Sequence, residues 1–279
     1  MLKRGQVTIF IVVGLIIFSV FAGITLLLKQ TTLSSLPTEK VPAEVAPVKS
    51  FVENCLEKTA HEGLYLLGQQ GGYYELEQES PELFYFNLFP IIYAENNSRL
   101  EPVLRPYYFS EQGKNFPSLQ KIESELSKYL QENLPFCLNQ FNDFKELYEI
   151  KTGELIASAN FFYGQTLLEL NYPLQITYRQ KDFSLNHFKV NLNFDFLEKY
   201  ELVEKMIQEQ EINLRQVPLG YLTNLAYEHD FTFETITFAD APIIQFDFIF
   251  TEDFGEKPYI YAFMIKYDWN EEEIVEEEI

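Results

Sequence analysis

The chain has 279 residues and a formal net charge of −21; three of its 21 basic residues and none of its 42 acidic residues lie within residues 1–29, so the remainder carries −24. A surface with that charge repels phosphate backbones and argues against binding to DNA or RNA. The 26 Phe and 18 Tyr side chains favour strands and bury large areas, so the roughly 230 residues beyond the first ~50 predict a sheet-rich domain with a substantial core.

The first predicted element is a transmembrane helix over Val7–Leu28, a run without any charged residue. At 1.5 Å per residue this run spans ~33 Å, which matches the hydrocarbon thickness of a bilayer. Lys3 and Arg4 precede it and the acidic domain follows. The positive-inside rule therefore predicts a single-pass protein of the cell membrane, with its N-terminus in the cytoplasm and its C-terminal domain outside.

A cleaved secretory signal is the alternative interpretation of the same run. Such a signal has an apolar stretch of ~7–15 residues and ends at a small-x-small site. The observed run is longer, and Thr25–Lys29 contains no such site. We therefore expect the helix to remain on the chain as its anchor.

A basic pair, a glycine and a glutamine lead into the hydrophobic run, in the order Lys3-Arg4-Gly5-Gln6-Val7-Thr8-Ile9-Phe10. This start resembles archaeal proteins that carry a class III, type IV prepilin-like signal. The resemblance implies that a dedicated peptidase cuts between Gly5 and Gln6, and that the helix stays on the mature protein as an anchor or filament core.

The chain departs from polymerising pilins in two respects. Phe10 occupies the position where those subunits have the Glu that pairs with a neighbouring subunit's amine, and prolines at 37, 42 and 47 prevent the anchor helix from continuing as a long spine. Segments 54–73 and 105–137 are also similar to archaeal membrane-anchored proteins. The resemblance therefore implies a minor pilin-like or anchored protein rather than a major pilin.

Residues 30–47 are rich in Ser, Thr, Pro and Ala and predict a semi-extended linker that could reach ~55 Å. An extracytoplasmic domain is expected over 48–270. Six Glu among the nine residues 271–279 predict a disordered, solvated tail.

Two helices are expected early in the domain. Apolar residues recur at helical spacing from Val48 to Leu67, with Gly68 as the expected C-cap. A second helix is expected to begin at Ser118 and to end at Pro135. The apolar run Leu83–Tyr93 is too short to cross a membrane and predicts a core strand or a buried loop.

The second half is expected to consist mostly of strands. Hydrophobic and polar residues alternate over 189–196, and a phase change predicts a bulge or turn near Asn186-His187. Helices are expected over 194–210 and 219–227, and a three-strand meander over 231–238, 243–250 and 259–267. Helices segregated from an antiparallel sheet predict an α+β fold.

The two cysteines, Cys55 and Cys137, lie in or beside the two early helices. In an oxidising exterior they are expected to form one disulfide, the alternative being two buried thiols. Asn96 begins an Asn-x-Ser sequon and is a candidate glycosylation site.

No motif in the sequence predicts a catalytic, cofactor-binding or metal-ligating residue. The glycine-rich run at 68–72 follows a helix C-terminus, where anions are disfavoured, and predicts a cap and turn. The three histidines are scattered, Glu228-His229-Asp230 and the acidic run 252–256 lack the spacing of metal sites, and the aromatic run Tyr107-Tyr108-Phe109 is interpreted as packing rather than as a sugar-stacking platform.

These observations favour a membrane-anchored, non-enzymatic surface protein that acts through contacts with other surface or pilus-like proteins, without a cofactor. An anchored module that binds a peptide or glycan is the second hypothesis, and a carboxylate-based ectohydrolase is the third. An open strand edge or a flat apolar patch would favour the first, an aromatic groove the second, and a deep pocket with two carboxylates the third.

Overall fold

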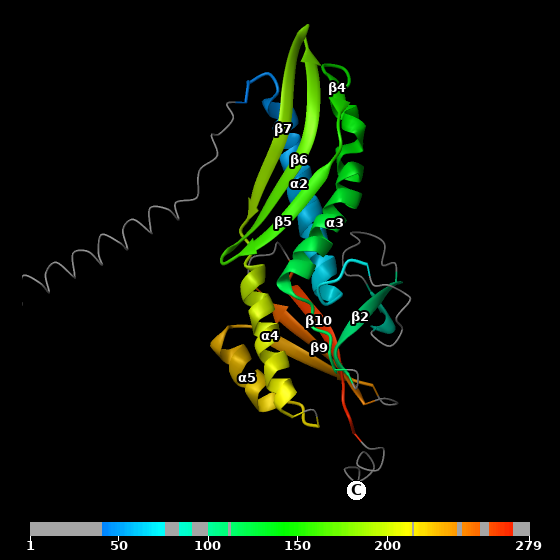
Figure 1. Ribbon diagram of the computed structural model, residues 1–279, viewed down its shortest axis with the longest axis vertical. Coiled ribbons are helices and arrows are strands. Elements are labelled where there is room, and N and C mark those ends of the chain that lie inside the picture. Colours follow the sequence, from blue (N-terminus) through cyan, green and yellow to red (C-terminus); the bar gives the residue numbers. More distant parts are fainter. Residues whose placement is uncertain are drawn as a thin grey trace, which may run out of the picture. The chain divides into compact units, whose positions relative to one another are not determined.

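The computed structural model (Figure 1) describes residues 41–75, 84–90, 100–110, 113–213, 215–238, 242–251 and 257–269. The chain divides into two units, Met1–Pro42 and Ala43–Ile279, and all the helices and strands described below lie in the second. The predicted membrane span, Gly5, Gln6, Asn96 and the acidic tail lie outside the described residues. Within the described ranges, no helix is both long and apolar enough to cross a membrane.

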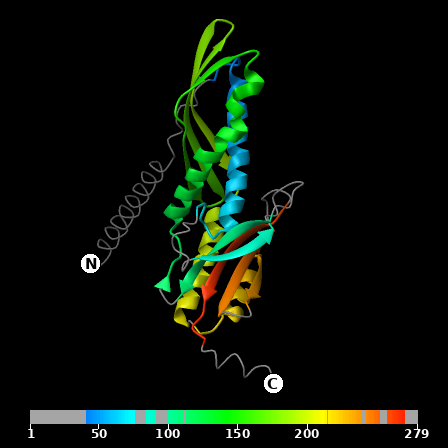
Figure 2. The ribbon, with the colours of Figure 1, turned by 90° about the vertical axis from the view of Figure 1, so that its right-hand side faces the viewer.

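Helices α2 and α3 lie side by side against one sheet (Figures 1 and 2). In α3, apolar residues spaced four apart form a fully buried stripe, and the Ser118 hydroxyl accepts from the Lys121 N–H to cap its start. The helical elements within the described residues are α2 (Ala46–Gln69), α3 (Leu119–Leu138), the 3-10 helix η1 (Asn139–Phe144), α4 (Phe196–Ile212) and α5 (Leu219–Glu228).

The four-stranded sheet is fully antiparallel. It contains β4 (Glu149–Thr152), β5 (Ile156–Phe162), β6 (Gln165–Tyr178) and β7 (Lys181–Leu192). The long strand β6 pairs with β7 along one edge and with both β5 and β4 along the other. Helix α3 contacts β5, and α2 contacts β7.

The six-stranded sheet has the order β1-β2-β10-β9-β8, with β3 on β2. Its strands are β1 (Phe84–Pro90), β2 (Leu100–Ser110), β3 (Gly113–Lys114), β8 (Thr232–Thr237), β9 (Ile243–Phe250) and β10 (Tyr259–Lys266). All pairs are antiparallel except β2 with β10, which run parallel; β10 is the last strand of the antiparallel series β8, β9 and β10.

Aromatic packing joins the two sheets through α4. Phe196 at the start of α4 stacks on Phe161 of β5 with 4.1 Å between ring centroids, and its other side faces Tyr259 and Tyr261 of β10. All these side chains are buried, and burial of a ring of this size contributes ~1.5–3 kcal/mol. The abundance of Phe and Tyr in the sequence therefore has a structural use at this junction.

The predicted α+β class, the two early helices and the three-strand meander are confirmed. The predicted bulge is also present: pairing of β6 with β7 shifts between Asn171 and Leu174, so Tyr172 and Pro173 lie opposite Asn186 alone. The sequence predicted no strand in the segments that form β2, β3, β4, β5 and β6. The sheets are antiparallel as expected except at the β2–β10 pair, which is parallel.

Two predicted helix ends are wrong. Gly68 is not the cap of α2, which continues to Gln69; its missing side chain instead allows contact with β10, since a Cβ there would lie 2.4 Å from the Ile260 carbonyl oxygen. Pro135 does not end α3 but lies inside it, and its carbonyl accepts from the N–H of Asn139, the left-handed residue that ends the helix. The buried side chains of Leu134 and Leu138 hold this last turn in place.

Candidate functional site

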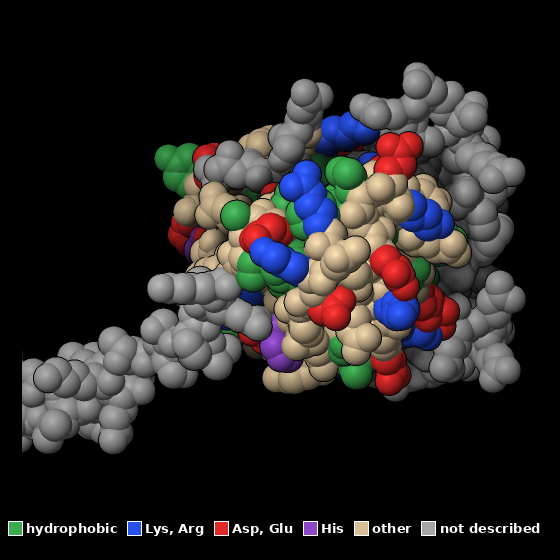
Figure 3. Space-filling model, turned by 90° about the horizontal axis from the view of Figure 1, so that it is seen from above, with side chains coloured by type: hydrophobic (Ala, Val, Ile, Leu, Met, Phe, Trp, Pro, Cys, Tyr) green, Lys and Arg blue, Asp and Glu red, His purple; other side chains and the backbone are tan. Residues whose placement is uncertain are grey.

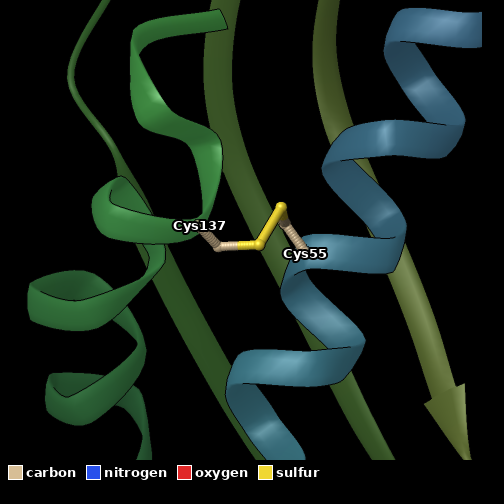
Figure 4. Close-up of a disulfide and its surroundings, with 2 residues drawn as sticks. All are labelled: Cys55 and Cys137. Carbon is tan, nitrogen blue, oxygen red and sulfur yellow. A yellow bond between two sulfur atoms is a disulfide. The ribbon is translucent and has the colours of Figure 1, made fainter. Parts of the chain in front are cut away.

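The predicted disulfide is present between Cys55 of α2 and Cys137 of α3 (Figure 4). The two Cα atoms are 5.7 Å apart, within the range that a disulfide spans without movement of the backbone. The bond connects residues 82 positions apart and joins the two helices directly. No free cysteine remains, since the chain has only these two.

A buried charged pair fixes the other end of α2 to the six-stranded sheet. The Arg105 guanidinium on β2 donates to the carbonyl oxygen of Gln69 at 2.7 Å, which satisfies a carbonyl at the negative end of the helix. Asp247 on β9 lies 3.7 Å from the same guanidinium. The Gln245 amide donates to both oxygens of Asp247 at 2.8 Å.

Burial dominates the titration of this pair. Desolvation lowers the pKa of Arg105 against the opposing effect of Asp247, and raises the pKa of Asp247 against the opposing effects of Arg105 and Gln245. Glu234 on β8 adds to the increase for Asp247. The guanidinium binds a helix terminus of its own chain, so the cluster is best explained as a structural link between α2 and the sheet.

The aromatic run on β2 is part of the core, as interpreted from the sequence. Tyr107, Tyr108 and Phe109 are 8%, 0% and 9% exposed, so none can serve as a platform for a sugar. The Tyr108 hydroxyl donates to the Gly71 carbonyl at 2.6 Å and lies 2.8 Å from the Tyr261 hydroxyl. Burial raises the pKa of both phenols well above the usual value, so they remain neutral hydrogen-bonding groups.

The remaining candidates do not converge on one site. His61 lies on α2, His187 on β7, and His229 caps α5 through its N–H to Leu225. In the part of the chain that the structure describes, no three His, Cys, Asp or Glu side chains form a group that could hold a metal ion. The acidic run 252–256 lies outside that part.

The described domain contains cavities at the four-stranded sheet and beside α4. The larger, of about 230 Å³, is lined by Tyr163, Gly164, Gln165, Asn191, Leu192 and Asn193 at one end of the four-stranded sheet. The smaller, of about 50 Å³, lies between the start of α4 and the start of β8 and contains Lys199, Glu198 and Asp230. The two carboxylates are exposed and the Lys199 ammonium lies 5.1 Å from the centre of the Phe250 ring, so this cavity does not bury a pair of carboxylates.

Strand β8 forms one edge of the six-stranded sheet. Phe231, just before it, is buried against Phe248 and Phe250 and fixes where the strand begins. The strand then pairs with β9 from Thr232 to Thr237, and it is the last strand in the sheet order on that side. Five of its six residues are exposed, and no described strand pairs with its outer side.

The sequence of β8 is unusual for an exposed edge. Its residues are Thr-Phe-Glu-Thr-Ile-Thr, with high strand propensity, no proline, no lysine and a single charge at Glu234. Folded proteins commonly protect an open edge with charges, prolines or covering elements, because unpaired N–H and C=O groups recruit other strands. Within the described residues, β8 has no proline and only one charged side chain, Glu234, to protect its edge.

Two edge strands of the four-stranded sheet, β5 and β7, are protected. On β5, the N–H groups of Ala159 and Phe161 donate to the Ser127 hydroxyl and the Glu123 carboxylate of α3, each at 3.0 Å. On β7, the exposed residues include Lys181 and Lys189, which discourage pairing with another strand. The contrast makes the outer edge of β8 the candidate interaction site.

Figure 3 shows the surface at one end of the domain. Acidic and basic side chains are interspersed there, and the hydrophobic side chains in view are scattered rather than gathered in one patch. Such a mixed surface is typical of a solvated face.

The sequence identified 231–238 as a strand but could not identify it as an edge, because edge position depends on strand order.

Comparison with protein-family models, with curated proteins and with solved structures finds no match in any of the three. The functional conclusion therefore depends on the chemistry of this chain alone.

Proposed function

We propose that the protein is a membrane-anchored, extracytoplasmic surface subunit without enzymatic activity, which binds other proteins by strand addition at β8. The observation that supports this best is the accessible outer edge of β8, with strong strand propensity and one charge. Strand addition supplies main-chain hydrogen bonds for affinity, while alternate side chains select the partner.

Two further features support the proposed location. A disulfide between α2 and α3 suits an oxidising exterior, since such bonds are rare in reducing compartments. The uncharged run Val7–Leu28 after Lys3 and Arg4 is long enough for an anchor. In this proposal the resemblance to prepilin-like signals implies a mature chain that begins at Gln6 and keeps its helix.

Location and processing are tested by intact mass and membrane washing. The mature chain is expected to begin at Gln6 and to remain with membranes after high-salt and alkaline washes, because these remove charge-held proteins but not a spanning helix. A start near Gln30 would indicate a cleaved secretory signal. A start at Met1 would retain the anchor and refute the prepilin-like processing.

Binding at β8 is tested by site-specific photo-crosslinking on intact cells. A photoreactive residue at Thr237 of β8 is expected to give discrete protein adducts, whereas the same residue at Thr223, exposed on α5, is not. Adding Ile236→Lys should abolish the adducts from position 237, since a lysine on the edge opposes pairing.

The matched substitution Ile212→Lys, on an exposed isoleucine at the end of α4, should leave the adducts unchanged. Equal adducts from Thr237 and Thr223, or adducts that resist Ile236→Lys, would refute the assignment of β8 as the binding edge.

A second candidate function is contact with a glycan at the 230 Å³ cavity. Three amide side chains line it beside Tyr163, which is 67% exposed, and amides with an exposed ring are suited to sugar hydroxyls and faces. The cavity is smaller than a typical ligand pocket, which ranks this candidate lower. Binding to a glycan array that Tyr163→Ala removes and Ile236→Lys retains would favour it.

A further inference from the structure

We propose that the strand added at β8 belongs to a second copy of this chain, so that two β8 strands pair antiparallel about a two-fold axis at Thr235. The inference depends on the proposed function, because it names the partner of the same edge. It makes the two six-stranded sheets one continuous sheet across the dimer.

Symmetry restricts the register of such a pair. Successive side chains of a strand point to opposite faces of the sheet. A two-fold axis perpendicular to the sheet places the two copies of any side chain on the same face. The two residues of a cross-strand pair must therefore both have even numbers or both have odd numbers. As a result, one residue of the strand must lie opposite its own copy. Within β8, from Thr232 to Thr237, a centre at Glu234 and a centre at Thr235 each align five residues of one copy with five of the other.

The register centred on Thr235 also gives compatible side-chain pairs. It places Glu234 opposite Ile236, Phe233 opposite Thr237, and Thr235 opposite itself. Aromatic–threonine and threonine–threonine pairs of this kind stabilise antiparallel sheets. A centre at Glu234 would instead place two carboxylates directly opposite each other, so the local charge selects the central threonine.

The net charge of −21 opposes any self-association, but β8 itself adds little negative charge to the proposed interface. Glu234 is the one charged residue on β8, and in this register it avoids its own copy. The more distant carboxylates of two copies are screened beyond ~8 Å at physiological ionic strength. The dimer is therefore expected to strengthen with salt and with Glu234→Gln.

The register is tested by cysteine substitution in the full-length protein, whose two native cysteines are already bonded to each other. Under mild oxidation, Thr235→Cys should form a covalent dimer, because the two central residues face each other. Thr237→Cys, also an exposed threonine, is the matched control. Its two copies would be four residues apart along the strands, ~13 Å, beyond the ~7 Å that a disulfide spans.

We expect crosslinking at Thr235 to be at least ~tenfold faster than at Thr237, and to fall when Ile236→Glu is added, because that substitution places a second carboxylate opposite Glu234 of the other copy. Equal rates at the two positions, or a faster rate at Thr237, would overturn the proposed register. If neither position crosslinks while photo-adducts to other proteins still form at Thr237 on cells, the self-partner is wrong and the proposed function stands. Absence of both crosslinks and photo-adducts would contradict both proposals.

Discussion

Replacement of Gly68 by alanine tests how α2 is seated on the six-stranded sheet. A Cβ at this position would lie 2.4 Å from the Ile260 carbonyl oxygen and 2.7 Å from the Tyr259 hydroxyl oxygen. The first is backbone in a paired strand, and the second belongs to a ring that is 0% exposed. Neither neighbour can move without disturbing β10, so the helix itself must shift.

The net effect of Gly68→Ala follows from two opposing contributions. Alanine gains ~1 kcal/mol over glycine in a helix. Overpacking of a tight contact costs ~1–3 kcal/mol or more, and a contact with immobile backbone lies toward the costly end of that range. We therefore expect the free energy of unfolding to fall by ~1–2 kcal/mol, which lowers the urea midpoint by ~0.5 M.

The matched control is Gly220→Ala in α5, where a Cβ meets nothing within 4 Å. That substitution should raise the free energy of unfolding by up to ~1 kcal/mol, because only the backbone entropy and helix propensity change. Urea unfolding of the full chain in detergent, followed by circular dichroism, measures both variants. A Gly68→Ala variant as stable as the original chain, or shifted in the same direction as Gly220→Ala, would refute the close contact.

Three further predictions concern the disulfide, the buried pair and a helix cap. Removal of the disulfide by Cys55→Ala with Cys137→Ala should lower the free energy of unfolding by ~4 kcal/mol in the chain-entropy account of a crosslink of this span, and a loss below ~1 kcal/mol would contradict it. Burial raises the folded-state pKa of Asp247 above its ordinary 3.8. The protonated carboxyl therefore contributes fully to stability below pH 3.8, and this contribution is lost as pH rises through the folded-state pKa. Between pH 3 and 7, the free energy of unfolding of the original chain should fall with pH relative to that of the Asp247→Asn variant. A relative rise with pH would be inconsistent with the burial of Asp247. Ser118→Ala should cost ~1 kcal/mol in thermal unfolding through loss of its hydrogen bond to the Lys121 N–H, and an unchanged midpoint would exclude that cap.

Features with a strong local signal were predictable from the sequence. The periodic apolar residues of α2 and α3, the Ser118 cap and the meander of β8, β9 and β10 depend on spacing and turn chemistry alone. The phase change near Asn186 likewise revealed the β6–β7 bulge, because one extra residue moves every later side chain to the other face. The disulfide was predictable because its two cysteines are the only ones in the chain.

Features that depend on tertiary context were not predictable. Gly68 looks like a helix cap in the sequence, and only the approach of β10 shows that it is a contact glycine. Arg105 gives no local signal of its bond to Gln69, which lies 36 residues earlier. The parallel β2–β10 pair and the edge position of β8 depend on strand order, which a single sequence does not contain.

Amide hydrogen exchange of β8 tests the central claim most directly. Exchange is compared between native membranes, where partners are present, and dilute protein purified in detergent. The account predicts that residues 232–237 become more protected in membranes, because strand addition fills their outward-facing hydrogen bonds. Residues 156–162 of β5 should not change, since α3 already binds Ala159 and Phe161 on that strand. Equal exchange of β8 in both preparations would contradict the assignment of this edge as the interaction site.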